Sequence, residues 1–509
     1  MWRRIAERWG SLMARFFLGL TGRERRDDAI AAALYRKAAE RGDAEEVRDM
    51  ASALALMYYK GRNVKQNYAK AAKWFCKAAE LGDVDAQFNL GLMYVEGLGV
   101  GQDYAKAAEC FRRAAEQGDT YSQSNLGQLY EQGLGVPQNH AKAMEWYHKA
   151  AERGNAAAAR RLALMYNEGR SVKQDYAKAA KWFRRAAKGG DVDAQFHLGL
   201  MHAEGLGVGQ DYAKAAEYFR RAAEQGDAYS QCNLGLMYEK GRGVKQSHAK
   251  AVEWYRRAAE RGDALAQFNL GGMYYRGDAV EQDCTEAAKW YRMAADQGNA
   301  SAQYSLGVIY HGGEGVERDT GEAAKWYRKA AEQGNTSARF NLALLYEDGK
   351  GVEQDPVKAA ELYYKAAEQG DENSQCNLGS LYRKGLGVEQ DDAEAAKWYR
   401  MAADQGNAAA QYNLGVLYHG GDGVEQDYEK AEDLYRKAAE QGNVNAQFNL
   451  GRMYEAGEGV ERDTEEAVKW YRRAAEQGDA DAQARLDAMD SDDKGLERTH
   501  ENPEVPTME

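Results

Sequence analysis

A single interval of 36 residues organises most of this chain. A mostly aromatic position recurs at that spacing, without insertion or deletion, in twelve copies: Trp74, Cys110, Trp146, Trp182, Tyr218, Trp254, Trp290, Trp326, Leu362, Trp398, Leu434 and Trp470. A period of this length is typical of proteins built from stacked repeats, in which each unit packs against its neighbours. Neither a structureless chain nor a string of unrelated domains would keep such a register.

Each 36-residue unit has the pattern of two helices. Residues 84–96 (VDAQFNLGLMYVE) carry apolar side chains at helical spacing, and residues 104–117 form the second helical segment. Capping residues such as Asp83 and Asp103 stand immediately before these segments, where they can bond the open N–H groups of a first turn. Gly82 and its equivalents stand where a helix would end in a left-handed residue. The pattern predicts a helix pair in every unit.

Small residues at fixed places predict that the two helices approach closely. The position of Gly91 is Gly in nine copies and Ala in three, although Gly inside a helix costs roughly 0.5–1 kcal/mol relative to Ala. Ala71, Ala78 and Ala79 are Ala in every second helix. We expect antiparallel pairing of these small faces, with larger side chains such as Leu90 filling the remaining volume.

Composition narrows the class of protein. The formal charge of −12 argues against a nucleic-acid-binding protein, which needs a basic face to neutralise phosphates. Five Cys is an odd number for a disulfide framework. No apolar run reaches the roughly 18 residues of a membrane span. The composition therefore favours a helical protein with reduced thiols.

The segment AQFNLGLMYVEGLGVGQDYAKAAECFRRAAEQGD (residues 86–119) resembles the Sel-one-like repeat, a relative of the tetratricopeptide repeat. The resemblance covers residues 48–483. It implies an all-α fold, an α/α superhelical solenoid of about twelve antiparallel helix pairs, with the first helices along a concave groove. It also implies a scaffold or adaptor that binds proteins or peptides, and many members are bacterial. The cysteines fall in unrelated positions, unlike those of the disulfide-rich relatives.

The ends of the chain depart from the repeat, as the capping units of a solenoid do. We expect an amphipathic helix and linker at residues 1–27 and a capping helix at 28–47. The solenoid then covers 48–483. Residues 484–509 are predicted to finish the last helix near Met489 and continue as a disordered acidic tail.

One face of the first helix varies between copies. The positions of Phe88, Leu92 and Val95 point the same way, and the resemblance places them along the groove. Aromatic and charged side chains of this kind are typical of protein-binding surfaces. For the position of Phe88, packing between neighbouring first helices is the competing interpretation. The predicted partner-binding residues are Phe196, Phe268, Tyr275, Tyr304, His311, Phe340, Glu347, Arg383, Tyr412, His419, Phe448 and Glu455.

Patterns that suggest chemistry are weak. The glycine-rich loop at 97–103 follows a helix and lacks the Gly-Lys-Ser/Thr of a phosphate loop. His311 and His419 lie three repeats apart, too far to share a metal ion. Some relatives have been linked to β-lactam hydrolysis. The Ser-x-x-Lys at Ser491–Lys494 has no companion motif and stands in the predicted tail. We expect no catalytic, cofactor or metal site.

Residues 1–20 carry an apolar stripe at helical spacing together with four arginines. Three interpretations remain: a helix that docks on a membrane surface or partner, a cap on the solenoid, and a targeting peptide. The overall prediction is a cytoplasmic, non-catalytic scaffold that binds a protein or peptide in its groove, without nucleic acid. The alternatives are a hydrolase acting on β-lactams and a peripheral membrane adaptor that uses residues 1–20.

Overall fold

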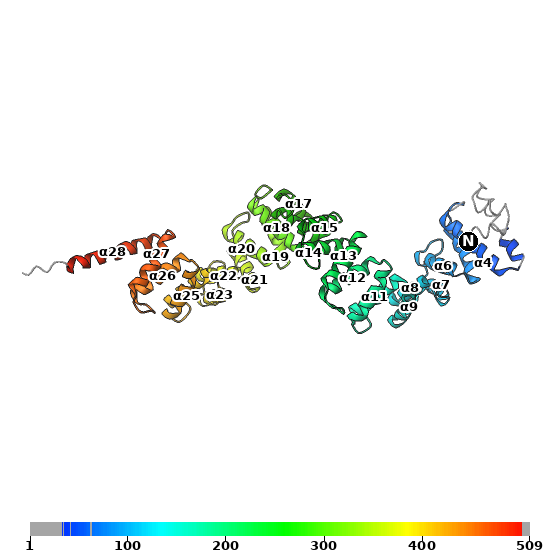
Figure 1. Ribbon diagram of the computed structural model, residues 1–509, viewed down its shortest axis with the longest axis horizontal. Coiled ribbons are helices and arrows are strands. Elements are labelled where there is room, and N and C mark those ends of the chain that lie inside the picture. Colours follow the sequence, from blue (N-terminus) through cyan, green and yellow to red (C-terminus); the bar gives the residue numbers. More distant parts are fainter. Residues whose placement is uncertain (1–32, 34, 41, 62–63, 501–509) are drawn as a thin grey trace, which may run out of the picture. The chain divides into compact units, whose positions relative to one another are not determined.

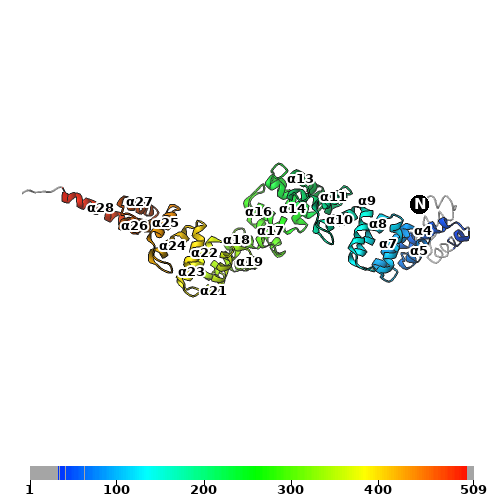
Figure 2. The same ribbon diagram turned by 90° about the horizontal axis from the view of Figure 1, so that it is seen from below.

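The computed structural model describes residues 33, 35–40, 42–61 and 64–500, the last ten of these by backbone alone. All regular elements in these ranges are helices, so the predicted all-α class is confirmed. The chain divides into two units, the first ending at Ala258 and the second beginning at Ala259. Within each unit, consecutive helices pack side by side as an α/α solenoid with the 36-residue period (Figures 1 and 2).

Each repeat contributes a first and a second helix. The first helices are α4 (Ala44–Lys60), α6 (Val84–Glu96), α8 (Thr120–Gln132), α10 (Ala156–Glu168), α12 (Val192–Glu204), α14 (Ala228–Lys240), α16 (Ala264–Arg276), α18 (Ala300–Gly312), α20 (Thr336–Asp348), α22 (Glu372–Lys384), α24 (Ala408–Gly420), α26 (Val444–Ala456) and α28 (Ala480–His500). The second helices are α5 (Tyr68–Glu80), α7 (Tyr104–Glu116), α9 (His140–Glu152), α11 (Tyr176–Lys188), α13 (Tyr212–Glu224), α15 (His248–Glu260), α17 (Cys284–Asp296), α19 (Thr320–Glu332), α21 (Pro356–Ala367), α23 (Asp392–Asp404), α25 (Tyr428–Glu440) and α27 (Thr464–Glu476).

The predicted N-caps are present. The carboxylate of Asp83 accepts a hydrogen bond from the N–H of Ala86 at 2.6 Å, and that of Asp103 accepts one from Lys106 at 2.9 Å. The N–H of Asp103 donates in turn to the carbonyl of Tyr94 at 2.9 Å. The cap residue therefore links the two helices of a repeat as well as starting the second one.

Glu286 stands three residues after the cap residue Asp283, a spacing that predicts a capping box, but only one half of the box forms. The N–H of Glu286 donates to the Asp283 carboxylate at 3.0 Å as expected, but the Glu286 carboxylate pairs with Lys289. The N–H of Asp283, which a capping box would satisfy, already donates to the carbonyl of Tyr274 at 3.0 Å. The glutamate is therefore left to pair with a lysine one turn further along.

The prediction of close approach at Gly91 is confirmed, and the neighbour is an aromatic ring. A Cβ atom at Gly91 would lie 2.6 Å from the Phe111 ring on α7. Gly199 and Gly235 face the rings of Phe219 and Tyr255 in the same way, at 2.5 and 2.7 Å. The missing side chain on the first helix therefore makes room for the largest buried side chain of the second helix.

Buried glutamines tie successive repeats together. Gln87 donates to the carbonyl of Ala79, at the end of the preceding second helix, at 3.1 Å. Its own side-chain carbonyl accepts a 2.9 Å bond from Gln117. Because the same pair of bonds recurs at positions such as Gln303, each repeat is bonded to the one before it as well as packed against it.

The described ends differ from the predicted boundaries. The first complete pair begins at Ala44 rather than residue 48, because Asp43 caps α4 through the N–H groups of Glu45 and Glu46. At the other end α28 continues past Met489 to His500, because helix-compatible residues continue and the next proline is Pro503. The predictions for residues 1–27 and 501–509 lie outside the described residues. In the part of the chain that is described, no helix is both long and apolar enough to span a membrane.

Candidate functional site

The twelve predicted partner-binding residues all lie on first helices, from α12 to α26. Each is half-buried, so one edge of the side chain packs inward and the other meets solvent. Phe196 belongs to the first unit and the remaining residues belong to the second. The structure thus places the predicted set on one type of helix.

Six of the predicted residues stand at the position of Phe88, and each packs against the second helix of its own repeat. Their ring centroids lie 5.6–6.1 Å from an aromatic ring there. The pairs are Phe196–Phe219, Phe268–Tyr291, Tyr304–Tyr327, Phe340–Tyr363, Tyr412–Tyr435 and Phe448–Tyr471. Ring pairs of this kind hold the exposed edge in a fixed orientation.

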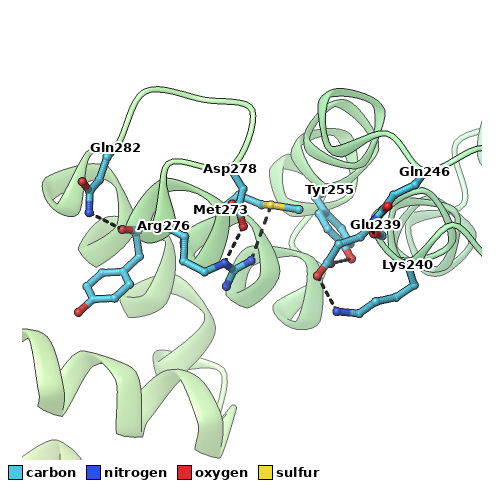
Figure 3. A network of polar contacts seen from close by, with 9 residues as sticks. Glu239, Lys240, Gln246, Tyr255, Met273, Arg276, Asp278 and Gln282 are labelled. Atoms are coloured by element: carbon cyan, nitrogen blue, oxygen red, sulfur yellow. Dashed lines mark hydrogen bonds and ion pairs between the residues drawn. The ribbon is translucent and has the colours of Figure 1, made fainter.

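The glutamates at the position of Val95 are hydrogen-bonded within their repeat. Tyr363 donates to Glu347 at 2.8 Å and Tyr471 donates to Glu455 at 2.6 Å. Figure 3 shows the equivalent bond of 2.7 Å from Tyr255 to Glu239, whose carboxylate also pairs with Lys240. Burial, and then the hydrogen bond to the carboxylate, raises the pKa of Tyr363 well above its usual range. These phenols therefore stay neutral donors.

Two other residues at the position of Val95 reach into the following repeat. Nε2 of His419 lies 2.9 Å from a carboxylate oxygen of Glu458. Tyr275 bonds Glu314, and this bond, followed by burial, raises the pKa of Tyr275 to about 12. The backbone carbonyl of Tyr275 also accepts a 2.9 Å bond from the side chain of Gln282. These side chains link neighbouring repeats along the face where the ligand contacts were predicted.

Two exposed tyrosines were missed by the sequence analysis. Tyr121 on α8 and Tyr229 on α14 are each 65% exposed. The Tyr121 ring lies 6.1 Å from Phe88 on α6, and the Tyr229 ring lies 6.1 Å from Phe196 on α12. We call Phe88–Tyr121 and Phe196–Tyr229 the aromatic pairs. The signal was present in the sequence, since most other copies have a small or polar residue at this position.

The aromatic pairs are related by an interval of 108 residues, which is three repeats. The same interval separates Glu131, Glu239, Glu347 and Glu455, each of which faces a tyrosine. The first unit therefore presents the same exposed aromatic surface twice, on equivalent helices.

The glycine-rich loops have a packing role. Gly99 has φ of +70°, and a Cβ atom there would lie 2.2 Å from the carbonyl carbon of Tyr68 at the start of α5. Val100 packs into the apolar cluster beside it. The loop thus uses its glycine to contact the preceding repeat, and its surroundings do not resemble those of a phosphate loop.

Metal and thiol chemistry gain no support in the described ranges. They contain no group of three or more His, Cys, Asp or Glu residues that could hold a metal ion. Burial raises the pKa of the Cys110 and Cys376 thiols to about 11, which disfavours the reactive thiolate. The side chains of Ser491 and Lys494 lie outside the described part.

The comparisons with known proteins agree with this architecture. The family model described as Sel1 repeat matches thirteen segments: 10–43, 49–83, 84–119, 120–155, 156–191, 192–227, 228–263, 264–299, 300–335, 336–371, 373–407, 408–443 and 444–479. The match at 10–43 is additional to the twelve copies counted from the aromatic position. No curated protein is similar enough to the chain to count as a match.

Two proteins with known crystal structures are similar to the chain in sequence. One, a protective antigen of uropathogenic Escherichia coli strains with an SLR fold, is 38% identical with a TM-score of 0.73. That alignment covers 86% of this chain and 98% of the antigen. A Sel1 repeat protein from Oxalobacter formigenes is 35% identical with a TM-score of 0.47, over 61% of this chain and 89% of the other. The chain belongs to the Sel1 repeat family, whose solenoids typically act as scaffolds for protein interactions.

Proposed function

We propose that this protein is a non-catalytic scaffold that binds a polypeptide segment along its first helices, with the aromatic pairs as the principal contacts. The observation that carries the proposal is the exposure of Tyr121 and Tyr229 above the half-buried rings of Phe88 and Phe196. Large aromatic side chains held rigidly at a surface contribute much of the binding energy in protein interfaces.

The twelve residues predicted from the sequence belong to the same proposal as a secondary set. Their half-buried rings and bonded carboxylates are already ordered, so a partner would lose little conformational entropy in contacting them. Glu347 and Glu455 keep their carboxylates oriented by a tyrosine, which suits them to accept further hydrogen bonds from a partner. We place the aromatic pairs first because their exposed area is larger.

Selection from a random peptide library displayed on phage, with the full chain as bait, tests the proposal. A selected peptide should bind at least about tenfold more weakly to the double variant Tyr121→Ser and Tyr229→Ser, because the exposed rings supply about 1–2 kcal/mol each. Tyr364→Ser is the matched control, since Tyr364 is exposed on a second helix. Equal loss in the control, or none in the double variant, would contradict the assignment.

The location of the protein is a separate proposal. We expect it in the cytoplasm, and fractionation of the source cells with an antibody against the chain tests this. Recovery with the membrane or secreted fraction would instead favour the readings of residues 1–20 as a membrane anchor or a targeting peptide.

A further inference from the structure

The repeat position of Trp74 usually holds an aromatic ring, which lies where one second helix faces the next. Trp326 on α19 is 4% exposed, and its ring lies beneath the Arg292 guanidinium at 5.4 Å and Nζ of Lys329 at 3.9 Å. Arg292 comes from the preceding second helix and Lys329 from the same helix as the indole. We call this arrangement the indole position. It combines a ring-sized space with two cations on the ring face.

On α21 the indole position is occupied by Leu362, and a cavity of about 410 Å³ opens there. Arg328 and Lys365 line it, and they are the equivalents of the two cations that hold Trp326. Leu342 and Tyr346, which are both buried, also line this cavity. The side chains that surround an indole elsewhere are therefore present here, and the indole is not.

A second cavity lies at an indole position that holds its indole. It lies along α7, α8 and α9, has a volume of about 440 Å³, and is lined by Trp146, Gln123 and Lys149 among others. Trp146 forms a wall of that cavity, whereas the cavity at Leu362 continues to Leu342 and Tyr346. The cavity at Leu362 is therefore lined by two buried side chains of α20 whose equivalents do not line the cavity at Trp146.

Arg339 gives the cavity at Leu362 a distinct charge. It stands where most other repeats carry the buried glutamine, and it donates to the carbonyls of Ala331 at 3.2 Å and Lys365 at 3.3 Å. These two bonds fix the guanidinium in the wall of the cavity. A planar guanidinium held in this way suits a carboxylate, which it can bond through two parallel N–H groups.

The other charged side chains leave a positive balance. Arg328 donates to the Tyr346 hydroxyl at 3.0 Å, and Lys358 is paired with Asp355 at 2.8 Å. Glu332 and Glu361 also line the cavity, so three cations face two carboxylates once Lys358 is neutralised by Asp355. The surroundings favour an anion over a cation.

We propose that the cavity beside Leu362 binds a planar aromatic group that carries a carboxylate. The ring takes the place of the missing indole between Arg328 and Lys365, and the carboxylate meets Arg339. A small aromatic acid and the carboxyl-terminal Trp of a polypeptide share this chemistry. The site is lined by α19, α20 and α21 and does not depend on the proposed function of the aromatic pairs.

Calorimetric titration of the full chain tests the site. The probes are indole-3-acetate, 3-methylindole, and a short peptide ending in Trp as the free acid or as the amide. We expect indole-3-acetate or the free-acid peptide to bind, with Leu362→Trp weakening it at least about tenfold because the new indole fills the space. Arg339→Gln should weaken the carboxylate probes about tenfold and leave 3-methylindole unchanged.

Leu434→Trp is the matched control, because Leu434 occupies the indole position on α25 where Gln411 stands in place of Arg339. This variant should bind the probes as the unmodified chain does, and thermal unfolding checks that both Trp variants are folded. Binding of indole-3-acetate identifies a small acid, and binding of the free-acid peptide alone identifies a polypeptide terminus. Absence of binding of either carboxylate probe at millimolar concentration, or wild-type affinity in Leu362→Trp, would overturn the proposal.

Discussion

The phenol of Tyr363 donates a 2.8 Å hydrogen bond to the carboxylate of Glu347, across the two helices of one repeat. In another repeat, Ala203 stands at the position of Glu347 and Phe219 at the position of Tyr363. Phe219 has no hydroxyl that needs an acceptor. In all four repeats with Glu at the first position, the second position is a Tyr that donates to it, which satisfies the buried phenol. Glu347 therefore supports the helix pair as well as facing the predicted groove.

Removing the donor tests this link. Tyr363→Phe should lower the free energy of unfolding by about 1–2 kcal/mol, because the half-buried Glu347 carboxylate loses a hydrogen bond. Glu347→Ala should cost a similar amount by leaving the buried phenol without its acceptor. Urea unfolding followed by circular dichroism measures both changes.

The double variant provides the control, since Glu347→Ala with Tyr363→Phe reproduces the Ala203–Phe219 pair. We expect it to be more stable than the sum of the single losses predicts, with a coupling energy of about 1 kcal/mol. Strictly additive losses would show that the hydrogen bond contributes nothing to stability.

His202 should make the fold sensitive to acid. Burial is the largest cause and lowers the pKa of His202, although a backbone hydrogen bond with Gly209 acts in the opposite direction. The unfolded chain then binds a proton that the folded chain resists, so stability is lost as the pH falls below about 6.5. His202→Tyr, which restores the residue of the other repeats, should reduce the loss of Tm between pH 7.5 and 5.5.

The exposed His248 provides the comparison for this experiment. His248→Tyr also introduces a residue that other repeats have at the same place, and it measures the effect of a His-to-Tyr change at an exposed position. His148 and His197 also have lowered pKa values, so His202→Tyr should remove only part of the acid sensitivity. An identical pH profile in His202→Tyr and the unmodified chain would refute the role of His202.

Ser171 occupies a loop position that is glycine in most repeats, and its φ is +64°. Left-handed backbone costs a residue with a side chain roughly 1–2 kcal/mol, so Ser171→Gly should raise the free energy of unfolding by about 1 kcal/mol. The reverse change, Gly207→Ala, should destabilise by about 1–3 kcal/mol, because its Cβ would lie 2.2 Å from the carbonyl carbon of Tyr176. Thermal unfolding of the two variants should show shifts of opposite sign, and shifts of the same sign would contradict the strain at Ser171.

The features that the sequence predicted well are those encoded within one repeat. Helix pairs, caps such as Asp83 and the close approach at Gly91 follow from local spacing and small residues. The predictions failed where a contact links two helices. The side chain of Glu286 pairs with a lysine because the cap N–H is already bonded to Tyr274, on the helix before it.

The candidate site was predicted only in part for the same reason. The sequence analysis followed the positions of Phe88, Leu92 and Val95, and it passed over Tyr121, whose exposure depends on the neighbouring helix. The sequence shows that Leu362 stands where most repeats have an aromatic residue. The cavity beside it also depends on Arg339 from another helix, and it could not be derived from spacing. Contacts between elements had to be seen in the structure.

Photo-cross-linking tests the central claim most directly. Tyr121 and Tyr229 are replaced, one at a time, by p-benzoylphenylalanine in the full chain, which is then irradiated with the library-selected peptide. The account predicts a covalent adduct at both positions and none when Tyr364 on α21 carries the same group. Cross-linking at Tyr364 alone, or none at either Tyr121 or Tyr229, would contradict binding along the first helices.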